Sequence, residues 1–518
     1  MREIALFCVL LAVTAPFSIA QTHCADLLKY QAPGMKLTIT KADARPASAA
    51  GTLRISPNFP GTVPAAIPAF CHVEGVIDQR TGRDGKPYGI GFALALPDQW
   101  NGRFLFQGGG GLNGNVALPL GSQAAGDEPA LARGFAVVTT DSGHKGSVFD
   151  GGFFRDQEAS LNFYYEAIGK VAPLAKQIIA SHYGRAPEHS YFDGCSTGGR
   201  EAMIMSQRYP EYFDGIISGD PAIRTGHSNL ALGFMTAVFD RAAPKDDSGK
   251  PDPRKTFSPS DRKLIVDSLL QTCDAKDGLK DGMIFNQRAC NFDPAALACS
   301  GPKTDTCLSK QQVDTLTIAF AGPKTRIGTS IYPGFPFDAG IDDKGMGIPG
   351  LLNGPVIPVA TGADFMHFDA DREAARVDAD ATAELGDSTW TNLSTFAGHG
   401  GKLLFYHGLS DPWFSPLDTL GYYEKMAKDT SNGDALSWSR IYFVPGMGHC
   451  QGGSATLDHF DMLTAVVDWV EKGVAPDRVI ATGHDFPGRS RPLCPYPQHA
   501  EYSGHGDTND AANFVCKQ

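Results

Sequence analysis

A serine and a histidine, far apart in the chain, each stand next to a cysteine in a glycine-rich turn. Ser196 follows Cys195 in a Gly-Cys-Ser-Thr-Gly motif, and His449 precedes Cys450 in Gly-Met-Gly-His-Cys. A serine hydroxyl becomes a strong nucleophile only when a neighbouring base takes its proton. One disulfide between Cys195 and Cys450 would hold the two residues side by side. The pair therefore predicts a serine hydrolase.

The turn around Ser196 has the surroundings of a nucleophile elbow. Residues 190–193 have strand character, and residues 199–209 are good helix formers. A Gly-x-Ser-x-Gly turn between a strand and a helix presents the hydroxyl at the carboxyl end of the strand. The N–H of Thr197, at the start of that helix, would stabilise a developing oxyanion. A glycine-rich turn without a catalytic role is the alternative, and the strand and helix around it disfavour it.

The base and its orienting acid are expected on two later turns. Asp411 follows an apolar run at 402–406, and His449 follows another at 440–444. The order Ser196, Asp411, His449 is the order of the triad in α/β-hydrolases. Taken alone, Asp411 could be an ordinary turn residue before proline and His449 a loop histidine. The three together predict a catalytic triad.

A second oxyanion donor is expected in the glycine run at 108–111, directly after an apolar run at 103–106. Glycine lets backbone N–H groups approach a substrate carbonyl, and Gly111 or Gly110 is the candidate. A phosphate-binding loop is disfavoured, because no Lys-Ser or Lys-Thr pair follows the glycines.

Three aspartates lie close together between two cysteines in the middle of the chain. Asp274, Asp277 and Asp281 fall between Cys273 and Cys290. Their carboxylates, completed by backbone carbonyls, would suit calcium. The spacing does not fit an EF-hand, and a solvated acidic turn is the alternative. The bracketing cysteines favour a structural calcium site.

The cysteines outside the first 20 residues form an even set of ten. In an exported chain such a set indicates disulfides, whereas zinc is disfavoured because no Cys-x-x-Cys pair occurs. Local spacing leaves Cys195 and Cys450 for each other. The remaining predicted pairs are Cys24 with Cys71, Cys273 with Cys290, Cys299 with Cys307, and Cys494 with Cys516.

Residues 1–20 have the pattern of a secretory signal, with a basic start, an apolar stretch and small residues at the end. No later stretch is long enough to span a bilayer, so we expect a soluble protein that is secreted or periplasmic. The net charge of −12 disfavours nucleic acid as a partner, because phosphate binding needs clustered Lys and Arg. The sequence does not indicate an oligomeric state.

The chain as a whole alternates strands and helices, which predicts an α/β fold with a mostly parallel sheet. The expected strands are 89–96, 103–106, 135–140, 190–193, 215–218, 402–406 and 440–444. The expected helices are 161–183, 199–209 and 460–471. The alternation fails between about 224 and 398 and then resumes. We therefore expect a catalytic domain of residues 21–223 and 399–518, with an inserted lid domain of residues 224–398 that carries the calcium loop.

The chain resembles the tannase and feruloyl esterase family along almost its whole length after residue 20. The motifs that carry the resemblance are residues 194–200, 410–411, 448–450, 100–103 with the glycine run, the aspartate-rich loop, 461–463 and 491–497. The resemblance implies an α/β-hydrolase fold, a triad of Ser196, Asp411 and His449, and an oxyanion hole from Gly111 and Thr197. It also implies a lid calcium. Its ligands would be Asp274, Asp277, the Leu279 carbonyl, Asp281 and the Met283 carbonyl.

The resemblance implies esters of aromatic acids as substrates: gallates, hydroxycinnamates or, in one branch, mono-(2-hydroxyethyl) terephthalate. That branch holds the free carboxylate of its substrate with a lid arginine, whereas residues 345–371 here contain neither Arg nor Lys. Feruloyl or galloyl esters are therefore expected, and the terephthalate half-ester is the alternative. Candidate contacts to the acyl group are Phe365, Met366, His367, Trp413 and Phe414. A calcium-dependent binding protein on a hydrolase scaffold is the alternative from another class, and a cysteine hydrolase using Cys195 is a third.

Overall fold

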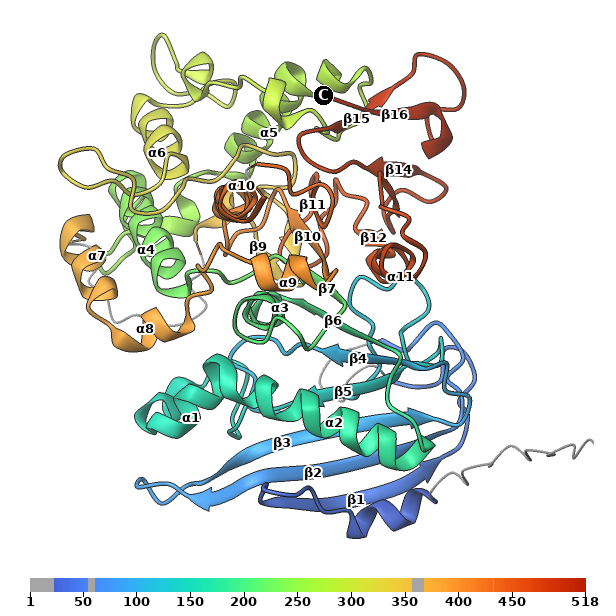
Figure 1. Ribbon diagram of the computed structural model, residues 1–518. Coiled ribbons are helices and arrows are strands. Elements are labelled where there is room, and N and C mark those ends of the chain that lie inside the picture. The colour runs from blue at the N-terminus through green and yellow to red at the C-terminus, as the bar shows by residue number, and fades with distance from the viewer. Residues whose placement is uncertain (1–22, 55–60, 356–367, 432) are drawn as a thin grey trace, which may run out of the picture.

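The computed structural model describes residues 23–54, 61–355, 368–431 and 433–518 (Figure 1). The signal expected at 1–20, and the lid residues Phe365, Met366 and His367, lie outside the described residues.

A nine-stranded sheet forms the centre of the molecule, in the order β1-β2-β3-β5-β4-β6-β7-β10-β11. The strands β5, β4, β6, β7, β10 and β11 run parallel to one another, and β3, β2 and β1 add an antiparallel edge that pairs with β5 through β3. The strands are β1 Leu37–Arg45, β2 Phe70–Thr81, β3 Pro87–Pro97, β4 Arg103–Gln107, β5 Ala136–Thr140, β6 His189–Cys195, β7 Gly215–Gly219, β10 Lys402–Gly408 and β11 Ser439–Val444.

Eleven α-helices and three small sheets surround this sheet in the described chain. The helices are α1 Gln157–Leu161, α2 Ala167–Tyr183, α3 Thr197–Arg208, α4 Thr225–Ala242, α5 Pro259–Cys273, α6 Lys310–Phe320, α7 Ala370–Asp378, α8 Ala381–Gly386, α9 Ser394–Gly398, α10 Pro416–Ser431 and α11 Met462–Lys472. The small sheets contain β8 Lys344–Gly345, β9 Ile348–Pro349, β12 His459–Phe460, β13 Val479–Thr482, β14 Ser490–Leu493, β15 His499–Tyr502 and β16 Phe514–Lys517. None of the helices in these described ranges has the length and hydropathy needed to cross a bilayer.

The central sheet has a buried core on each face, because successive side chains of a strand point to opposite sides. On β10, Leu403 and Phe405 pack with residues of α2, α3 and α10. Leu404 and Tyr406 face the other way and pack with residues of α11. With both faces covered, the parallel strands are apolar along nearly their whole length, which is why the sequence shows them as continuous apolar runs.

The insertion lies between β7 and β10, where the chain passes through the helices α4 to α9 (Figure 1). A separate apolar core forms there around Leu232, Phe239, Ile265, Leu269 and Leu316. This confirms the α/β-hydrolase fold with a large insertion between the strand before Ser196 and the strand before Asp411.

The structure differs from the sequence-based expectation at the N-terminal edge and in one helix. The sheet is mixed, since β1 and β2 were not expected and both pair antiparallel. The helix expected at 161–183 is divided by a π-helical turn at Asn162–Glu166. A π turn adds a residue to the helical repeat and rotates the following side chains, so apolar spacing alone does not reveal it.

Five disulfides join all ten cysteines of the described chain. They are Cys24–Cys71, Cys195–Cys450, Cys273–Cys290, Cys299–Cys307 and Cys494–Cys516, the pairs that the spacing predicts. With no free thiol among them, neither a zinc site that uses these cysteines as ligands nor a Cys195 nucleophile is compatible with this pairing.

Candidate active site

Ser196 occupies the sharp turn between β6 and α3, with a φ of 65°. This left-handed conformation is strained for a residue with a side chain, and such strain is common at active sites. A Cβ on Gly194 would lie 2.6 Å from the backbone of Gly198, and one on Gly198 would lie 2.7 Å from the carbonyl oxygen of Gly109. The glycines are needed because the turn packs directly against the glycine run. Ser196 is half-buried and lines a cavity.

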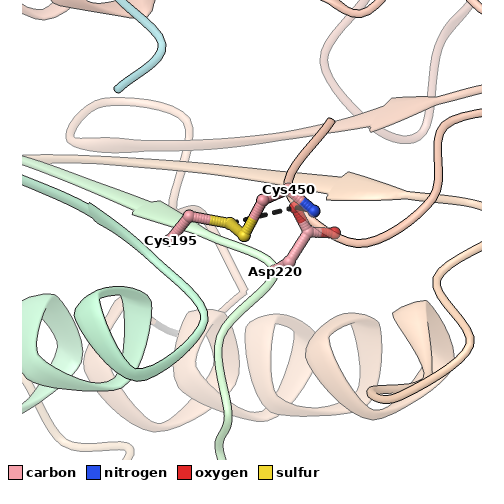
Figure 2. A group of neighbouring side chains, drawn as sticks. All are labelled: Cys195, Asp220 and Cys450. Carbon is pink, nitrogen blue, oxygen red and sulfur yellow. Dashed lines mark hydrogen bonds between the residues drawn. A yellow bond between two sulfur atoms is a disulfide. The ribbon is translucent and has the colours of Figure 1, made fainter. Parts of the chain in front are cut away.

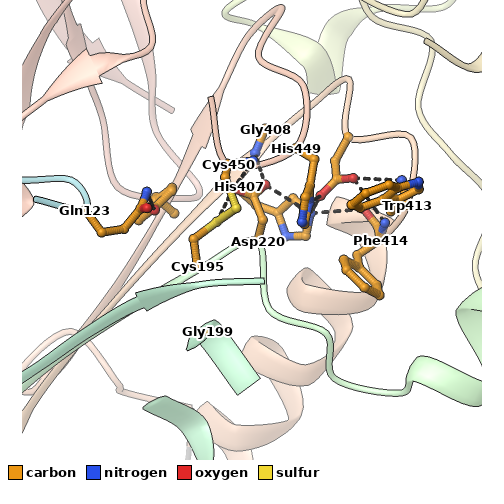
Figure 3. The surroundings of a disulfide bond; sticks show 12 residues. Gln123, Cys195, Gly199, Asp220, His407, Gly408, Trp413, Phe414, His449 and Cys450 are labelled. Carbon is orange, nitrogen blue, oxygen red and sulfur yellow. Dashed lines mark hydrogen bonds and ion pairs between the residues drawn. A yellow bond between two sulfur atoms is a disulfide. The ribbon is translucent and has the colours of Figure 1, made fainter. Parts of the chain in front are cut away.

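Asp411 and His449 are brought together at the carboxyl ends of β10 and β11, and Figure 3 shows His449 close to Trp413 and Phe414. His449 Nδ1 lies 2.8 Å from Asp411 Oδ2, and Asp411 Oδ1 accepts from the N–H groups of Trp413 at 2.8 Å and Phe414 at 3.1 Å. Both residues are buried. His449 Nε2 is buried and makes no hydrogen bond within the described chain. Because Nδ1 faces the carboxylate, Nε2 is the nitrogen that can act as a base.

The Cys195–Cys450 disulfide joins the nucleophile turn to the histidine loop across 255 residues of sequence, with 5.9 Å between the two Cα atoms (Figure 2). Asp220, which follows β7, lies against it. The N–H of Cys450 donates to Asp220 Oδ2 at 3.2 Å, and the same oxygen lies 3.4 Å from Cys195 Sγ. The disulfide thus connects the elements that carry Ser196 and His449.

Two residues near Asp411 were not identified from the sequence. Asp220 and His407 are fully buried, and His407 Nε2 lies 3.4 Å from Asp411 Oδ2 and 3.5 Å from Asp220 Oδ1. Their positions in the sequence could have indicated them, because both stand at the carboxyl ends of neighbouring parallel strands, where α/β proteins place functional groups. Burial raises the pKa of Asp220 to about 6. Burial would also raise the pKa of Asp411, but the two histidines outweigh it and hold that pKa below its usual range.

The glycine run after β4 leaves two backbone N–H groups without a protein partner among the described residues. The N–H groups of Gly108, Gly109 and Leu112 donate to Asp193, Glu201 and Val148, respectively, at 2.8 Å. The remaining ones belong to Gly110 and Gly111. Of these two, Gly111 lines the same cavity as Ser196.

Thr197 and Gly111 lie side by side, because the hydroxyl of Thr197 donates to the carbonyl oxygen of Gly111. Glu201, a further residue missed in the sequence, anchors the glycine run from α3. Its carboxylate is fully buried and accepts from Gly109 N at 2.8 Å and Asn113 Nδ2 at 3.0 Å. Gly111 and Thr197 both line the cavity that Ser196 lines, which makes their N–H groups the candidates for an oxyanion hole.

The cavity above Ser196 has a volume of about 320 Å³, and six of its nineteen lining residues are aromatic. Trp413 and Phe414 pack on the ring of His449 with centroid distances of 4.9 Å and 5.4 Å. The other aromatic side chains lining the cavity are Phe149, Phe154, Phe163 and Tyr164. A site of this size and composition accommodates one aromatic ring with a short linker.

Charged groups in the cavity wall are few and mostly acidic. Arg200 is the one Lys or Arg among the described lining residues, and its guanidinium donates to the carbonyl oxygens of Tyr164 at 2.8 Å and Phe163 at 3.1 Å. Asp380 and Asp387 line the same cavity. Burial raises the pKa of Asp387 to about 7.

The aspartate-rich loop lies in the insertion, apart from the triad elements. Asp274 and Asp277 are buried, and each accepts two backbone N–H groups of the loop. Burial raises both pKa values, that of Asp277 to about 7, and each is raised further by nearby carboxylates. Asp281 is paired with Arg491 and accepts from Met283 N at 3.3 Å.

This donor chemistry suits a hard cation, because crowded carboxylate oxygens are stabilised by a positive charge. The three carboxylates do not converge on a single point among the described side chains, so backbone carbonyls such as those of Leu279 and Met283 would have to complete a site.

Known proteins match this chain over most of its length. The profile of the family described as tannase and feruloyl esterase matches residues 71–353 and 357–517. A mono(2-hydroxyethyl) terephthalate hydrolase from Piscinibacter sakaiensis is 38% identical over 87% of this chain and 85% of its own length. A probable feruloyl esterase B-2 from Aspergillus terreus is 30% identical over 81% of this chain and 82% of its own.

Among solved structures, feruloyl esterase B from Aspergillus oryzae superimposes with a TM-score of 0.77 at 26% identity, covering 95% of this chain and 99% of that one. The chain therefore belongs to the tannase and feruloyl esterase family, and it is a carboxylic-ester hydrolase.

Proposed function

We propose that the protein hydrolyses esters of aromatic acids through an acyl-enzyme on Ser196, with His449 as general base and Asp411 as its orienting carboxylate. The observation that carries the proposal is the 2.8 Å contact between Asp411 Oδ2 and His449 Nδ1 beneath a cavity that Ser196 lines. Family membership also favours catalysis over the alternative of a calcium-dependent binding protein.

In the first half-reaction the Ser196 hydroxyl attacks the ester carbonyl while His449 Nε2 takes its proton. The N–H groups of Gly111 and Thr197 would stabilise the oxyanion. Collapse of the tetrahedral intermediate breaks the bond to the alcohol, which leaves with the proton from His449. Water, activated by the same nitrogen, then attacks the acyl-enzyme and releases the aromatic acid and free Ser196.

The acyl group is proposed to be of the feruloyl or galloyl type. The aromatic walls suit a flat ring. Asp387 and Asp380 offer acceptors for phenolic hydroxyls, which ferulate and gallate carry. A neutral ring bearing hydrogen-bond donors therefore matches the polarity of the described wall.

The mono-(2-hydroxyethyl) terephthalate activity named for one relative is the second candidate, favoured by 38% identity. Its substrate has a free ring carboxylate. In the described wall Arg200 already donates to two carbonyl oxygens, and Asp387 would repel the carboxylate. Leaving a buried ion unpaired costs several kcal/mol, so we place this activity second.

A side-by-side measurement of kcat/KM at neutral pH tests the proposal. The substrates are methyl ferulate, methyl gallate, mono-(2-hydroxyethyl) terephthalate and the methyl ester of the latter, a matched control that lacks only the charge. We expect a ferulate or gallate to be best, and the methylated terephthalate to exceed the half-ester. The half-ester as best substrate would overturn the assignment of the acyl group.

Calcium and export complete the proposal. Calcium would be held by Asp274, Asp277 and Asp281 with the carbonyls of Leu279 and Met283, and would stabilise the insertion without contacting the reacting atoms. Export is supported by the signal-like residues 1–20 and by the five disulfides, which persist in oxidising compartments.

A further inference from the structure

Behind the carboxylate of the triad lies a second histidine that the mechanism above does not use. His407, at the end of β10, has no exposed surface. Its Nδ1 lies 2.9 Å from Thr419 Oγ1 and its Nε2 lies 3.0 Å from the carbonyl oxygen of Phe414. Because a carbonyl oxygen can only accept, Nε2 carries a proton. The same nitrogen lies 3.4 Å from Asp411 Oδ2 and 3.5 Å from Asp220 Oδ1, and Figure 3 shows His407 beside Asp220.

The hydrogen bonds around the Asp220 carboxylate favour its ionised form. Its Oδ1 accepts from Gly408 N at 2.8 Å, and its Oδ2 accepts from Cys450 N at 3.2 Å. The remaining close neighbour of Oδ2 is Cys195 Sγ, a disulfide sulfur and a weak acceptor for a carboxyl proton (Figure 2). Hydrogen bonds donated to both oxygens favour the ionised form.

Two carboxylates, Asp220 and Asp411, are thus buried together where charge is poorly screened. With both histidines neutral, the cluster would hold two uncompensated negative charges, which is costly in a protein interior. His407 lies between the carboxylates and is the group placed to compensate them. Burial lowers the pKa of His407, but the two aspartates outweigh burial and raise it.

We propose that His407 is a positioning residue, a buried imidazolium shared by Asp220 and Asp411 that keeps Asp411 ionised and directed at His449. Asp220 extends the chain to the disulfide, so that one network spans from the cystine through His407 and Asp411 to His449. His407 does not contact the substrate. The inference rests on the proposed triad and adds that Asp220 and His407, on the side of Asp411 away from His449, control the ionisation of Asp411.

The titratable groups around His407 come from several elements. Asp220 follows β7, Asp411 follows β10, and His449 follows β11. Tyr332 interacts with Asp411 and Tyr406 with Asp220, and burial raises the pKa of both phenols far above neutrality. The phenols stay neutral, so the two aspartates and the two histidines alone set the charge of this site.

Removing one charge at a time from the full-length enzyme tests the proposal. His407→Gln keeps hydrogen-bonding atoms but loses the positive charge, so we expect the acid limb of kcat/KM to move to higher pH by about one unit. Asp220→Asn loses a negative charge, so we expect the limb to move to lower pH. The double variant should return towards the wild-type position, because opposite changes cancel.

For His407→Gln, we expect kcat to fall about tenfold with KM unchanged, since Asp411 orients the base and binds no substrate.

The matched control is His182→Gln, which replaces a buried histidine on α2 outside this network. It should change thermal stability without moving the pH profile. The proposal would be overturned if His407→Gln and Asp220→Asn left the acid limb of the kcat/KM profile unchanged, or if both moved it in the same direction. Failure of the triad itself would be separate, because Ser196→Ala would then remain active.

Nuclear magnetic resonance of the wild-type enzyme keeps the test independent of variant folding. In protein labelled with ¹⁵N-histidine, we expect one imidazole protected from solvent exchange to be protonated on both nitrogens at neutral pH. A buried ring that is neutral at pH 7, with one nitrogen unprotonated, would refute the shared imidazolium.

Discussion

Two groups of buried carboxylates, each beside a disulfide, are balanced in opposite ways. At the active site Asp411 lies between two histidines, which hold its pKa below the usual range. In the insertion Asp277 faces backbone N–H groups and other carboxylates, and burial raises its pKa to about 7. The same residue type is therefore an anion in one place and a poorly compensated acid in the other.

The difference lies in where the compensating charge comes from. Strands of the central sheet fix His407 and His449 next to Asp411, so the active site carries its own compensating cation in His407 and its base in His449. The insertion loop has Arg491 for Asp281 but no such partner for Asp274 or Asp277 among the described residues. A cation from solution would fill that role. We therefore expect the catalytic rate to depend on the carboxylates of the active site, and the thermal stability to depend on those of the insertion loop.

Matched substitutions in the two groups give the largest expected contrast. Asp411→Asn should lower kcat by about 10³–10⁴-fold, because an orienting amide favours the wrong histidine tautomer. With calcium present, Asp277→Asn should leave kcat within about twofold and lower thermal stability instead, because a ligand of the cation is lost. Steady-state kinetics and thermal unfolding of both variants check this. A large loss of kcat in Asp277→Asn would show that the insertion loop does take part in the chemistry.

Removal of the two disulfides sharpens the contrast at a smaller scale. Replacing Cys195 and Cys450 by alanine should lower kcat by about 10–100-fold, because misplacement of a catalytic group by about 1 Å costs that much. Replacing Cys273 and Cys290 should reduce stability and leave kcat nearly unchanged. Both pairs should lower the free energy of unfolding by about 2–4 kcal/mol. Equal kinetic effects from the two pairs would contradict the separation of roles.

The smallest expected effect is a pH-dependent response to chelation. In the folded protein the pKa of Asp277 is raised to about 7, above the value of about 3.9 in an unfolded chain. Deprotonation then favours unfolding, so without a metal the stability should fall as pH rises from about 4 to 7. We expect chelator to lower Tm by more at pH 8 than at pH 5, and calcium to restore it. A chelator effect that is equal at both pH values would argue against a cation on these carboxylates.

The elements that carry local signals were predictable from sequence. Ser196, Asp411 and His449 each stand on a turn after an apolar strand, and small residues mark the turns. The cysteine pairs followed from spacing in the same way. The parallel strands were found because burial on both faces gives continuous apolar runs.

Partners that depend on strand register could not be read from the chain. Asp220 meets His407 only because β7 and β10 are parallel neighbours, with Gly219 opposite Tyr406. Glu201 looked like an ordinary helix residue, and its role appears only when the glycine run packs against α3. The strands β1 and β2 lie far from any catalytic motif in the sequence, so no motif predicted them.

The most direct test of the central claim is the identity of the residue that carries the acyl group. Rapid acid quench of the enzyme with methyl ferulate, followed by peptide mass spectrometry, should place a feruloyl group on Ser196. Ser196→Ala should give no adduct, unfold at nearly the wild-type temperature and lose activity by several orders of magnitude. An adduct on another residue, or activity of Ser196→Ala within about tenfold of wild type, would contradict the account.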